Sequence, residues 1–456
     1  MALNILLTTP PIEKIIEPLY DKPLFVRNSL AAIAGYLRTD PEFNIICIDA
    51  KFEQKNLKNL VEEIMLFKPD VLGISSFTYE VKQADLLAHA VKKELPGCII
   101  IIGGSHVSAL PEDTLIEFPK FDLGCIGESE VTMMDLCRAI LKNQEYYHLK
   151  GIVYRDKNLM PHKNIPAEKI FNLSDIPMPV WDILPSAKEY FIQTSRGCPY
   201  NCNFCFNPNG NKIRTRTVEN IINEINFIID HFHPERISFG DEAFAANKKF
   251  AHELLDVMIA QNIGSKVKWD IQTHVAFIDD ELLFKMKNAN IQKIELGVES
   301  GNESILKNMG KGINKLMIIN AFKLTRKHKI KTGAFIIFGH PNETKKTIWE
   351  TIRFVSKLNP SEPIFAIMVP FPGTKIAEMA KNKSMGYSSI SLNWDFYRKQ
   401  INNSIEFSNF PIRQLKMFLL TGHFYVFLAN FRIYGLLKFI YRNRSSAWAF
   451  VSRLFS

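Results

Sequence analysis

Residues 190–205 read YFIQTSRGCPYNCNFC and mark the start of the second half of the fold. The run Tyr190–Ser195 is short and opens with three large apolar residues, which is typical of a strand. A polar loop follows at once and carries Cys198, Cys202 and Cys205 in the spacing C-x3-C-x2-C. We therefore expect a strand whose carboxyl end leads into a loop bearing three thiols.

The sequence after this loop alternates between strand-like runs and segments with helical spacing of apolar residues. The further strand-like runs are Arg236–Phe239, Lys266–Gln272, Lys293–Val298, Thr332–Phe338 and Pro363–Val369. The helical segments are Val218–Phe232, Lys248–Gln261, Asp279–Asn288, Lys315–His328, Lys345–Leu358 and Lys375–Lys381. Six β/α units in a row predict a partial (β/α)6, TIM-like barrel with its active site at the carboxyl ends of the strands.

The first 150 residues show a separate alternation. Its strand-like runs are Leu3–Thr8, Asn44–Asp49, Val71–Ser75, Cys98–Ile102 and Asp122–Ile126. Its helical segments are Ser29–Arg38, Leu57–Phe67, Val81–Leu95 and Glu130–Leu141. Continuous apolar runs between amphipathic helices predict an α/β domain with a doubly wound parallel sheet, whose ligand lies beyond the carboxyl ends of the strands. The loops there lack G-x-G-x-x-G and Gly-Lys-Ser/Thr motifs, which disfavours nucleotides of those types.

These patterns divide the chain into an α/β domain (1–150), a Pro-rich connector that starts with a small hairpin (151–187), the partial barrel (188–385) and a helical C-terminal region (386–456). Residues 411–456 contain seven Lys or Arg and no Asp or Glu, against a net charge of +9 for the whole chain. The expected helices there are Gln414–Tyr425, Asn430–Tyr441 and Ser445–Leu454. Their dense aromatics and cations leave two interpretations open: a helical cap on the barrel, which we favour, or a helix at the surface of an anionic membrane.

Composition excludes several classes of protein. The chain has 456 residues, of which 46% are hydrophobic and 23% charged, as in ordinary globular proteins and unlike disordered, collagen-like or polytopic membrane chains. We find no apolar run of the ~18–20 residues that a spanning helix needs, and no signal-peptide pattern at the N-terminus. Seven cysteines, with no such signal, favour a reducing, cytoplasmic location. Charge outside the C-terminal region is nearly balanced, so we expect no nucleic-acid partner.

The cysteine triplet is the strongest chemical signal. Thiolates are soft ligands that hold iron–sulfur clusters, and three of them match three irons of a [4Fe–4S] cube, leaving the fourth iron open. A zinc site would need a fourth Cys or His at regular spacing, and none follows nearby. The other cysteines, Cys47, Cys98, Cys125 and Cys137, fall in apolar segments and are expected to be buried and inert.

The motif C-x3-C-x-aromatic-C after the first barrel strand resembles the radical S-adenosylmethionine (radical SAM) enzymes. In that family the open iron binds S-adenosylmethionine, which reduction cleaves to methionine and a 5′-deoxyadenosyl radical. Four further segments resemble motifs of the family: Phe239–Phe244, Glu295–Gly301, Gly333–Thr344 and Pro370–Thr374. Together they make the resemblance specific over about residues 188–385.

The resemblance implies a set of residues for S-adenosylmethionine: Phe204, Asp241, Glu242, Glu299, Ser300 and Gly339. A structural alternative exists for some of them, and for Glu343. Asp241 or Glu242 could cap the following helix, Glu343 could be a carboxylate at a helix N-terminus, and Phe204 could only pack the loop. His274 stands where relatives often carry an arginine, and we assign it no role beyond lining the pocket.

The first domain resembles that of the cobalamin-binding subgroup of radical SAM enzymes. Segments 103–113 (GGSHVSALPED) and 127–132 (GESEVT) are similar to the subgroup's GGxHxSxxPEE and GEGExT, with Ser129 in place of a glycine. The resemblance implies cobalamin-binding residues Thr9, Pro10, Ser75, Phe77, Gly103, Gly104, His106, Gly127 and Glu128. The cobalt-ligating motif D-x-H-x-x-G is absent, so we do not assign His106 as a cobalt ligand. The tRNA methylthiotransferases are disfavoured, because the chain lacks their N-terminal cysteine triplet and RNA-binding β-barrel.

These resemblances imply an enzyme that uses a [4Fe–4S] cluster, S-adenosylmethionine and cobalamin, most simply as a C-methyltransferase acting on an unactivated carbon. The alternatives are a cyclase or oxidoreductase with the same cofactors but no methyl transfer, and a non-catalytic cobalamin or iron–sulfur sensor. We expect a small-molecule or lipid-like substrate and an electron donor such as flavodoxin or ferredoxin. The location is expected to be cytoplasmic, with possible contact at the inner face of a membrane. The sequence identifies neither the catalytic residues nor the substrate.

Overall fold

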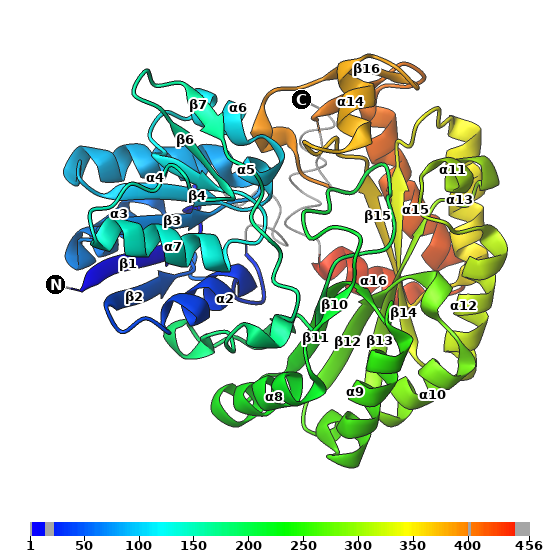
Figure 1. Cartoon of the computed structure of the whole chain (residues 1–456). Helices are drawn as coiled ribbons and strands as arrows, with labels where there is room; N and C mark the ends of the chain where they lie inside the picture. Colours follow the sequence, from blue (N-terminus) through cyan, green and yellow to red (C-terminus); the bar gives the residue numbers. More distant parts are fainter. Residues whose placement is uncertain (1, 14–21, 400–402, 443–456) are drawn as a thin grey trace. The chain divides into compact units, whose positions relative to one another are not determined.

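The computed structural model describes residues 2–13, 22–399 and 403–442 (Figure 1). The chain forms two compact units. The first comprises Met1–Phe191, Phe206–Gly210 and Arg214–Pro234, and the second comprises Ile192–Cys205, Asn211–Ile213 and Glu235–Ser456. The cysteine loop therefore belongs to the second unit, and most of the chain from Phe206 to Pro234 belongs to the first unit again.

The first unit contains a seven-stranded sheet in the order β2-β1-β3-β4-β5-β6-β7. Its strands are β1 (Leu3–Thr8), β2 (Phe43–Ile48), β3 (Val71–Ser75), β4 (Ile99–Gly103), β5 (Leu123–Cys125), β6 (Ile152–Arg155) and β7 (Pro161–Lys163). β1 to β5 are parallel, and the strand order reverses between β1 and β3, which is where such sheets hold ligands. The doubly wound sheet is confirmed. The expected hairpin is β6–β7, and it extends this sheet in antiparallel fashion, which we did not predict.

Helices cover both faces of this sheet (Figure 1). They are α2 (Asn28–Leu37), α3 (Leu57–Phe67), α4 (Val81–Glu94), α5 (Ser105–Ala109), α6 (Pro111–Glu117) and α7 (Glu130–Leu141). The helix α8 (Val218–Phe232) also belongs to this unit. α2 packs with α7, and α3 packs with α4. The strands between them are buried along almost their whole length, which explains why they read as continuous apolar runs rather than alternating ones.

The second unit contains five strands of a six-stranded sheet in the order β15-β14-β13-β12-β11-β8, and of the edge strand β8 only Ile192 belongs to that unit. Its strands are β8 (Glu189–Ile192), β11 (Arg236–Phe244), β12 (Lys268–Thr273), β13 (Ile291–Glu299), β14 (Lys331–Phe338) and β15 (Glu362–Ile367). β11 to β15 pair in parallel, and β8 and β15 lie at opposite edges. The predicted run of six β/α units is thus an open parallel sheet.

The helices that follow these strands begin at well-defined caps. They are α9 (Lys248–Ala260), α10 (Asp280–Asn288), α11 (Glu303–Asn308), α12 (Lys315–Lys327), α13 (Lys345–Leu358) and α14 (Lys375–Lys381). Each is preceded by an Asn, Asp or Thr whose side chain accepts a hydrogen bond from a backbone N–H of the first turn. Such caps satisfy donors that would otherwise lack partners, so they fix where each loop above the sheet ends.

The described part of the C-terminal region ends in helices, as we expected, but it contains a strand pair that we did not predict. It begins with an antiparallel pair, β16 (Tyr387–Ile390) and β17 (Ile405–Phe407), before α15 (Ile412–Ala429) and α16 (Ile433–Arg442). α15 packs on α13 and β15, as a cap on the sheet would. The predicted third helix, 445–454, lies outside the described residues. Among the described helices, none is both long and apolar enough to cross a membrane.

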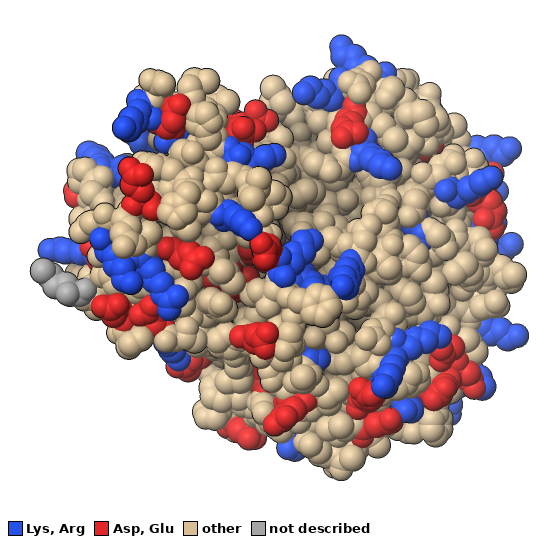
Figure 2. Space-filling model, viewed as in Figure 1, with Lys and Arg blue, Asp and Glu red and all other residues tan. Residues whose placement is uncertain are grey.

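Charges are interspersed on the surface in view (Figure 2). Lys and Arg alternate there with Asp and Glu, as expected for a chain whose net charge is concentrated in residues 411–456.

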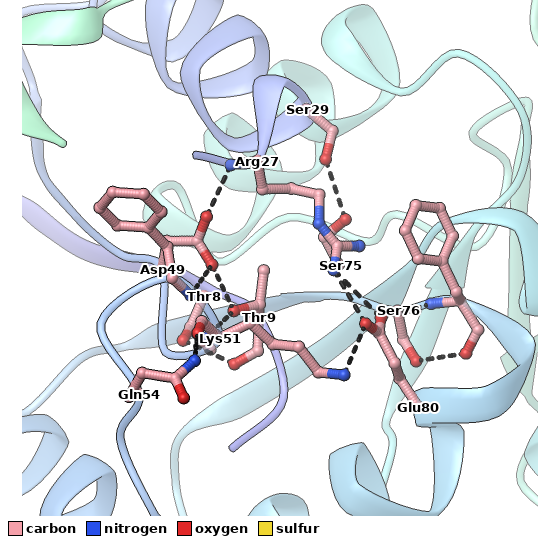
Figure 3. Close-up of polar contacts among 12 residues, drawn as sticks. Thr8, Thr9, Arg27, Ser29, Asp49, Lys51, Gln54, Ser75, Ser76 and Glu80 are labelled. Carbon is pink, nitrogen blue, oxygen red and sulfur yellow. Dashed lines mark hydrogen bonds and ion pairs between the residues drawn. The ribbon is translucent and has the colours of Figure 1, made fainter. Parts of the chain in front are cut away.

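A buried network of charges fixes the carboxyl ends of β1, β2 and β3 (Figure 3). Glu80 accepts hydrogen bonds from Arg27 Nη2 at 3.0 Å and lies 3.1 Å from Lys51 Nζ. Asp49 accepts from the backbone N–H of Arg27 at 2.6 Å and from Thr9 Oγ1 at 2.9 Å. Burial alone would raise the pKa of Glu80, but the two cations outweigh it and hold that pKa below its ordinary value of 4.5.

We predict that Glu80→Gln lowers the free energy of unfolding by about 3–5 kcal/mol, because it leaves two buried cations without a counter-charge. Since the pKa of Glu80 is depressed in the folded state, its contribution is present above pH 4.5 and is lost as the pH falls through the folded-state pKa. The difference between wild type and variant in urea unfolding should therefore shrink in acid. Asp182→Asn, which removes a half-exposed partner of Arg38, is the control and should cost less than about 1 kcal/mol.

Candidate functional site

The cysteine loop follows the two-residue strand β9 (Ser195–Arg196) in the second unit. All three cysteines are free thiols; Cys198 and Cys202 are half-buried and Cys205 is exposed. The pKa of Cys202 is raised to about 12, mainly by burial and further by the neighbouring Cys205 and Cys198, whereas Lys311 opposes the shift. The thiols thus lie close enough to repel one another as thiolates, which fits a shared cluster with a thiolate on each of three irons. Among the described residues, no three His, Cys, Asp or Glu converge to hold a metal ion.

A segment more than a hundred residues away supports this loop. Asn203 donates its backbone N–H to Met309 O at 2.9 Å and its side-chain amide to Asn308 O at 3.3 Å. Gly310 has φ +75°, and a Cβ there would lie 2.6 Å from Asn201 O. On the other side, Ile376 donates its N–H to Asn203 O at 3.1 Å. We did not predict this support; the only hint in the sequence is the pair of glycines flanking Lys311.

Asp241 holds the strand that enters the loop. Its buried carboxylate accepts from the backbone N–H groups of Thr194 and Ser195, both at 2.7 Å, and from Thr194 Oγ1. Burial raises the pKa of Asp241 to about 7, although these hydrogen bonds oppose the shift. The exposed neighbour Glu242 is close enough to raise the pKa of Cys198 and Cys205. Neither acid caps α9, because Asn247 does so.

Glu299 ends β13, Ser300 follows it, and both residues are buried. Glu299 is buried, has φ +61°, and forms an ion pair with Lys311, whose ammonium also donates to Gly297 O at 3.0 Å. Ser300 Oγ lies 3.2 Å from Thr351 Oγ1. A Cβ at Gly297 would fall 2.0 Å from Lys311 Nζ, so the glycine makes room for the ammonium. Lys311 is therefore a central residue of the site that the sequence did not reveal.

The loop after β14 lies beside the aromatic residue of the cysteine loop. The rings of Phe204 and His340 meet edge-on with centroids 6.0 Å apart. Glu343 Oε2 accepts from the N–H groups of Gly339 at 2.5 Å and His340 at 3.2 Å, and Tyr387 donates to Gly339 O at 2.9 Å. Glu343 thus ties together the loop just before α13, while Thr344 caps that helix. Burial raises its pKa to about 8.

The residues expected around cobalamin all lie at the carboxyl edge of the first sheet, but several are held by internal contacts. Thr9 and Pro10 are buried, with Thr9 bonded to Asp49. Ser75 Oγ lies 2.9 Å from Ser29 Oγ. Glu128 forms a buried ion pair with Arg214, an unpredicted partner that also donates to Ile170 O. These contacts fix the positions of the loops.

The accessible part of this edge includes glycines and an aromatic residue. Phe77 is 40% exposed, and the Arg27 guanidinium lies 4.2 Å from its ring centroid. Gly103 ends β4 and Gly104 follows it, and a Cβ at Gly104 would meet Ser76 O at 2.3 Å. Nothing lies within 4 Å of the corresponding point at Gly127. At Gly127, backbone without a side chain beside open space fits the close approach of a flat macrocycle.

His106 faces the interior rather than this open edge. It is 1% exposed, and its ring lies edge-on to Phe118 with centroids 6.4 Å apart. Burial lowers the pKa of His106 to about 4, so the imidazole is neutral near pH 7.

Comparisons with known proteins identify one family in the first sheet region and another in the region of the cysteine loop. The family model of the radical SAM superfamily matches residues 192–355, and that of the B12 binding domain matches residues 26–137. A protein of Pyrococcus horikoshii named as an uncharacterized methyltransferase is 29% identical over 92% of this chain and 91% of its own length. An anaerobic magnesium-protoporphyrin IX monomethyl ester cyclase of Rubrivivax gelatinosus is 26% identical over 75% of this chain and 64% of its own length.

Solved structures show the same fold. The radical S-adenosylmethionine methyltransferase TsrM from Kitasatospora setae aligns with a TM-score of 0.70 and 17% identity, over 84% of this chain and 75% of its own. The cobalamin-dependent S-adenosylmethionine radical enzyme OxsB aligns with a TM-score of 0.73 and 19% identity, over 90% and 65%. The family models confirm the resemblances drawn from the cysteine loop and from the glycine segments.

We predict that Gly104→Ala lowers the free energy of unfolding by about 2 kcal/mol or more. Its φ of +106° and ψ of −170° are nearly exclusive to glycine, and the added methyl group would clash with Ser76 O. Gly127→Ala is the matched variant, since its φ of +75° is also positive but its surroundings are open, so only about 1 kcal/mol is expected. Urea unfolding of both variants checks that Gly104→Ala lowers the free energy of unfolding more than Gly127→Ala does. Equal decreases in the two variants would contradict the prediction.

Proposed function

This chain is a cobalamin-binding radical SAM protein, and we propose that it transfers a methyl group to an unactivated carbon of its substrate. The observation that carries the proposal is that one chain holds both a loop of three neighbouring thiols and a parallel sheet with bare glycines at its carboxyl edge. A three-cysteine loop leaves one iron open for S-adenosylmethionine, and the glycine edge accommodates a macrocycle. Similarity to proteins named as methyltransferases supports the choice of reaction.

Cys198, Cys202 and Cys205 would hold the [4Fe–4S] cluster, and the loops with Phe77, Gly104 and Gly127 would hold cobalamin. When bound, the cluster supplies the electron that cleaves S-adenosylmethionine, and cobalamin supplies the methyl group. The role of the chain is to orient these groups. Asp241 fixes the entry to the cysteine loop, and Asn203 anchors its centre.

Phe204, Glu242 and Gly339 are the residues we propose to contact S-adenosylmethionine directly. Glu242 is exposed beside the cysteines, and its carboxylate suits an ammonium group. Phe204 offers a ring face for stacking, and Gly339 has φ +95° beside it, where a side chain would crowd Phe407. Asp241, Glu299 and Ser300, also implied by the resemblance, act in this proposal by shaping the site, because their side chains are bonded within the protein.

The second candidate is a cyclase or oxidoreductase reaction with the same cofactors. It is favoured by the similarity to magnesium-protoporphyrin IX monomethyl ester cyclases. The two reactions differ in their products. Methyl transfer forms S-adenosylhomocysteine as well as 5′-deoxyadenosine, whereas cyclisation forms only the latter from S-adenosylmethionine.

The test is anaerobic. The protein is reconstituted with iron, sulfide and cobalamin, supplied with dithionite, S-adenosylmethionine and a filtered cell extract, and its nucleoside products are measured by mass spectrometry. We expect 5′-deoxyadenosine and S-adenosylhomocysteine, both dependent on cobalamin, and neither from Cys202→Ala. Cys137→Ala, a buried thiol in the first unit, is the matched control and should retain both products. 5′-Deoxyadenosine alone would favour the cyclase, and absence of both from cluster-replete protein would contradict both candidates, leaving a sensor.

We further propose that the enzyme is cytoplasmic and contacts the inner face of an anionic membrane through α16. Ile433, Tyr434, Leu437 and Tyr441 are each at least 59% exposed and recur at helical spacing on one face. The opposite face packs on α15, where Gly435 meets the ring of Phe427. An apolar face among cations, with no acidic residue after Pro411, suits the interface of anionic lipids. A lipid-like substrate and a flavodoxin or ferredoxin as electron donor fit this location.

We predict that the full chain binds phosphatidylglycerol vesicles in a salt-sensitive manner and phosphatidylcholine vesicles weakly. Leu437→Glu should weaken the binding about tenfold or more, because a buried Leu is worth about 1.5–3 kcal/mol. Leu66→Glu places the same change on an exposed leucine of α3 and should have no effect. Vesicle co-sedimentation measures both. Equal binding by the two variants, or a concentration-dependent dimer that Leu437→Glu abolishes, would contradict the membrane proposal.

A further inference from the structure

One aromatic ring of the cysteine loop packs on a histidine of the sheet. Tyr200 lies between Cys198 and Cys202, and its ring stacks on that of His274 with centroids 4.0 Å apart and an angle of 18°. His274 directly follows β12, so the stack joins the loop to the carboxyl end of a central strand. Phe277 flanks both rings, with centroids 5.9 Å from Tyr200 and 5.4 Å from His274.

The hydrogen bonds of His274 select one tautomer. Its Nδ1 accepts from the backbone N–H of Ala276 at 3.2 Å, so the ring proton lies on Nε2. Nε2 then donates to Lys311 O at 3.1 Å. The imidazole is 7% exposed, and both nitrogens are satisfied. A ring held by two hydrogen bonds offers a fixed surface on which Tyr200 can stack.

The same histidine also holds the segment that supports the loop. Lys311 O bonds to His274, while the ammonium of Lys311 pairs with Glu299. Next to it, Gly312 has φ +68°, and a Cβ there would lie 3.2 Å from Tyr200 Cε1. His274 therefore contacts the loop through its ring and contacts the supporting segment through Nε2.

We propose that His274 is a positioning residue for the iron–sulfur cluster, acting through Tyr200 and the carbonyl of Lys311 to keep the three thiols in place before the cluster forms. The inference rests on the proposed function, since it presupposes the cluster. Its physical basis is preorganisation: a loop that is already ordered does not lose conformational entropy when its ligand binds. Partners that orient metal ligands typically change metal affinity 10–100-fold when they are mutated.

The chain contains a matched control. His423 in α15 is a half-buried histidine, stacked on Phe439 with centroids 4.2 Å apart and an angle of 19°, and bonded through Nδ1 to Leu419 O. It has the same kind of packing on a different aromatic partner. His423→Ala thus reproduces the general cost of losing a stacked, hydrogen-bonded imidazole.

The experiment compares His274→Ala, Tyr200→Leu, the double variant and His423→Ala after anaerobic reconstitution of the full chain. The readouts are iron per chain, the rate of cluster loss to a chelator, the electron paramagnetic resonance spectrum of the reduced cluster, and the Tm of the apoprotein. We expect about tenfold faster cluster loss and a broadened spectrum in both single variants at the cysteine loop. The double variant should lose its cluster no faster than either single one, because each already breaks the stack.

Two conservative variants separate the ring from its hydrogen bonds. His274→Phe keeps a ring for Tyr200 but neither hydrogen bond, and His274→Asn can cap Ala276 but offers no ring. Each should fall between wild type and His274→Ala in its rate of cluster loss. Because His274→Phe keeps the ring's apolar volume, its rate of cluster loss can test the inference even if His274→Ala does not fold.

The outcomes are distinguishable. If the cluster of His274→Ala matches that of wild type or of His423→Ala in spectrum and rate of loss, the inference is wrong and the proposed function stands. If wild-type protein assembles no cluster, the proposed function fails and the inference falls with it. A lower Tm in His274→Ala without any change in the cluster would show a purely structural role and would also overturn the inference.

Discussion

Thiolates repel one another, and the second unit is organised around holding three of them in eight residues of chain. Burial and mutual charge raise the pKa of Cys202 to about 12, so the bare loop favours the neutral thiols. The protein holds the loop through groups outside it: the carboxylate of Asp241 at its entry, the carbonyl of Met309 at its centre and the cation of Lys311 beside it. A cluster would relieve the repulsion by binding the thiolates, so the scaffold provides geometry while the metal provides affinity.

In the first unit, buried salt bridges hold the loops at the carboxyl edge of the sheet in place. Its strands end in loops that must stay open to a large ligand, yet open loops lack a core to order them. Glu80 with Arg27 and Lys51, and Glu128 with Arg214, fix these loops from beneath. Some of the side chains that the sequence motifs assign to the ligand, such as Glu128, instead belong to this internal framework. The accessible part of the carboxyl edge includes glycines and Phe77.

Local patterns were sufficient to predict most of the fold. Val218–Phe232 and Lys345–Leu358 are helices with the predicted bounds, because amphipathic spacing and a threonine cap mark them in the sequence itself. What depends on distant partners was missed: the addition of β6–β7 to the first sheet, the β16–β17 pair, and the roles of Lys311 and Arg214. Glu128 and Arg214 are 86 residues apart, and His274 and Lys311 are 37 apart, so no local periodicity connects them. The cysteines were found because their ligand geometry is encoded in eight consecutive residues.

The path of the chain after the cysteine loop has a consequence for how the protein is built and dissected. The first unit is discontinuous in sequence: α8 belongs to it but is translated after the thiols of the second unit. α8 supplies Glu224, whose buried carboxylate accepts from the indole of Trp181 at 2.9 Å and pairs with Arg216. A fragment that ends at residue 187 would therefore leave Trp181 without its partner and expose the surface that α8 covers. Both units are discontinuous in sequence, so neither can be excised as one continuous segment. During synthesis, the first unit is complete only when residue 234 has been added.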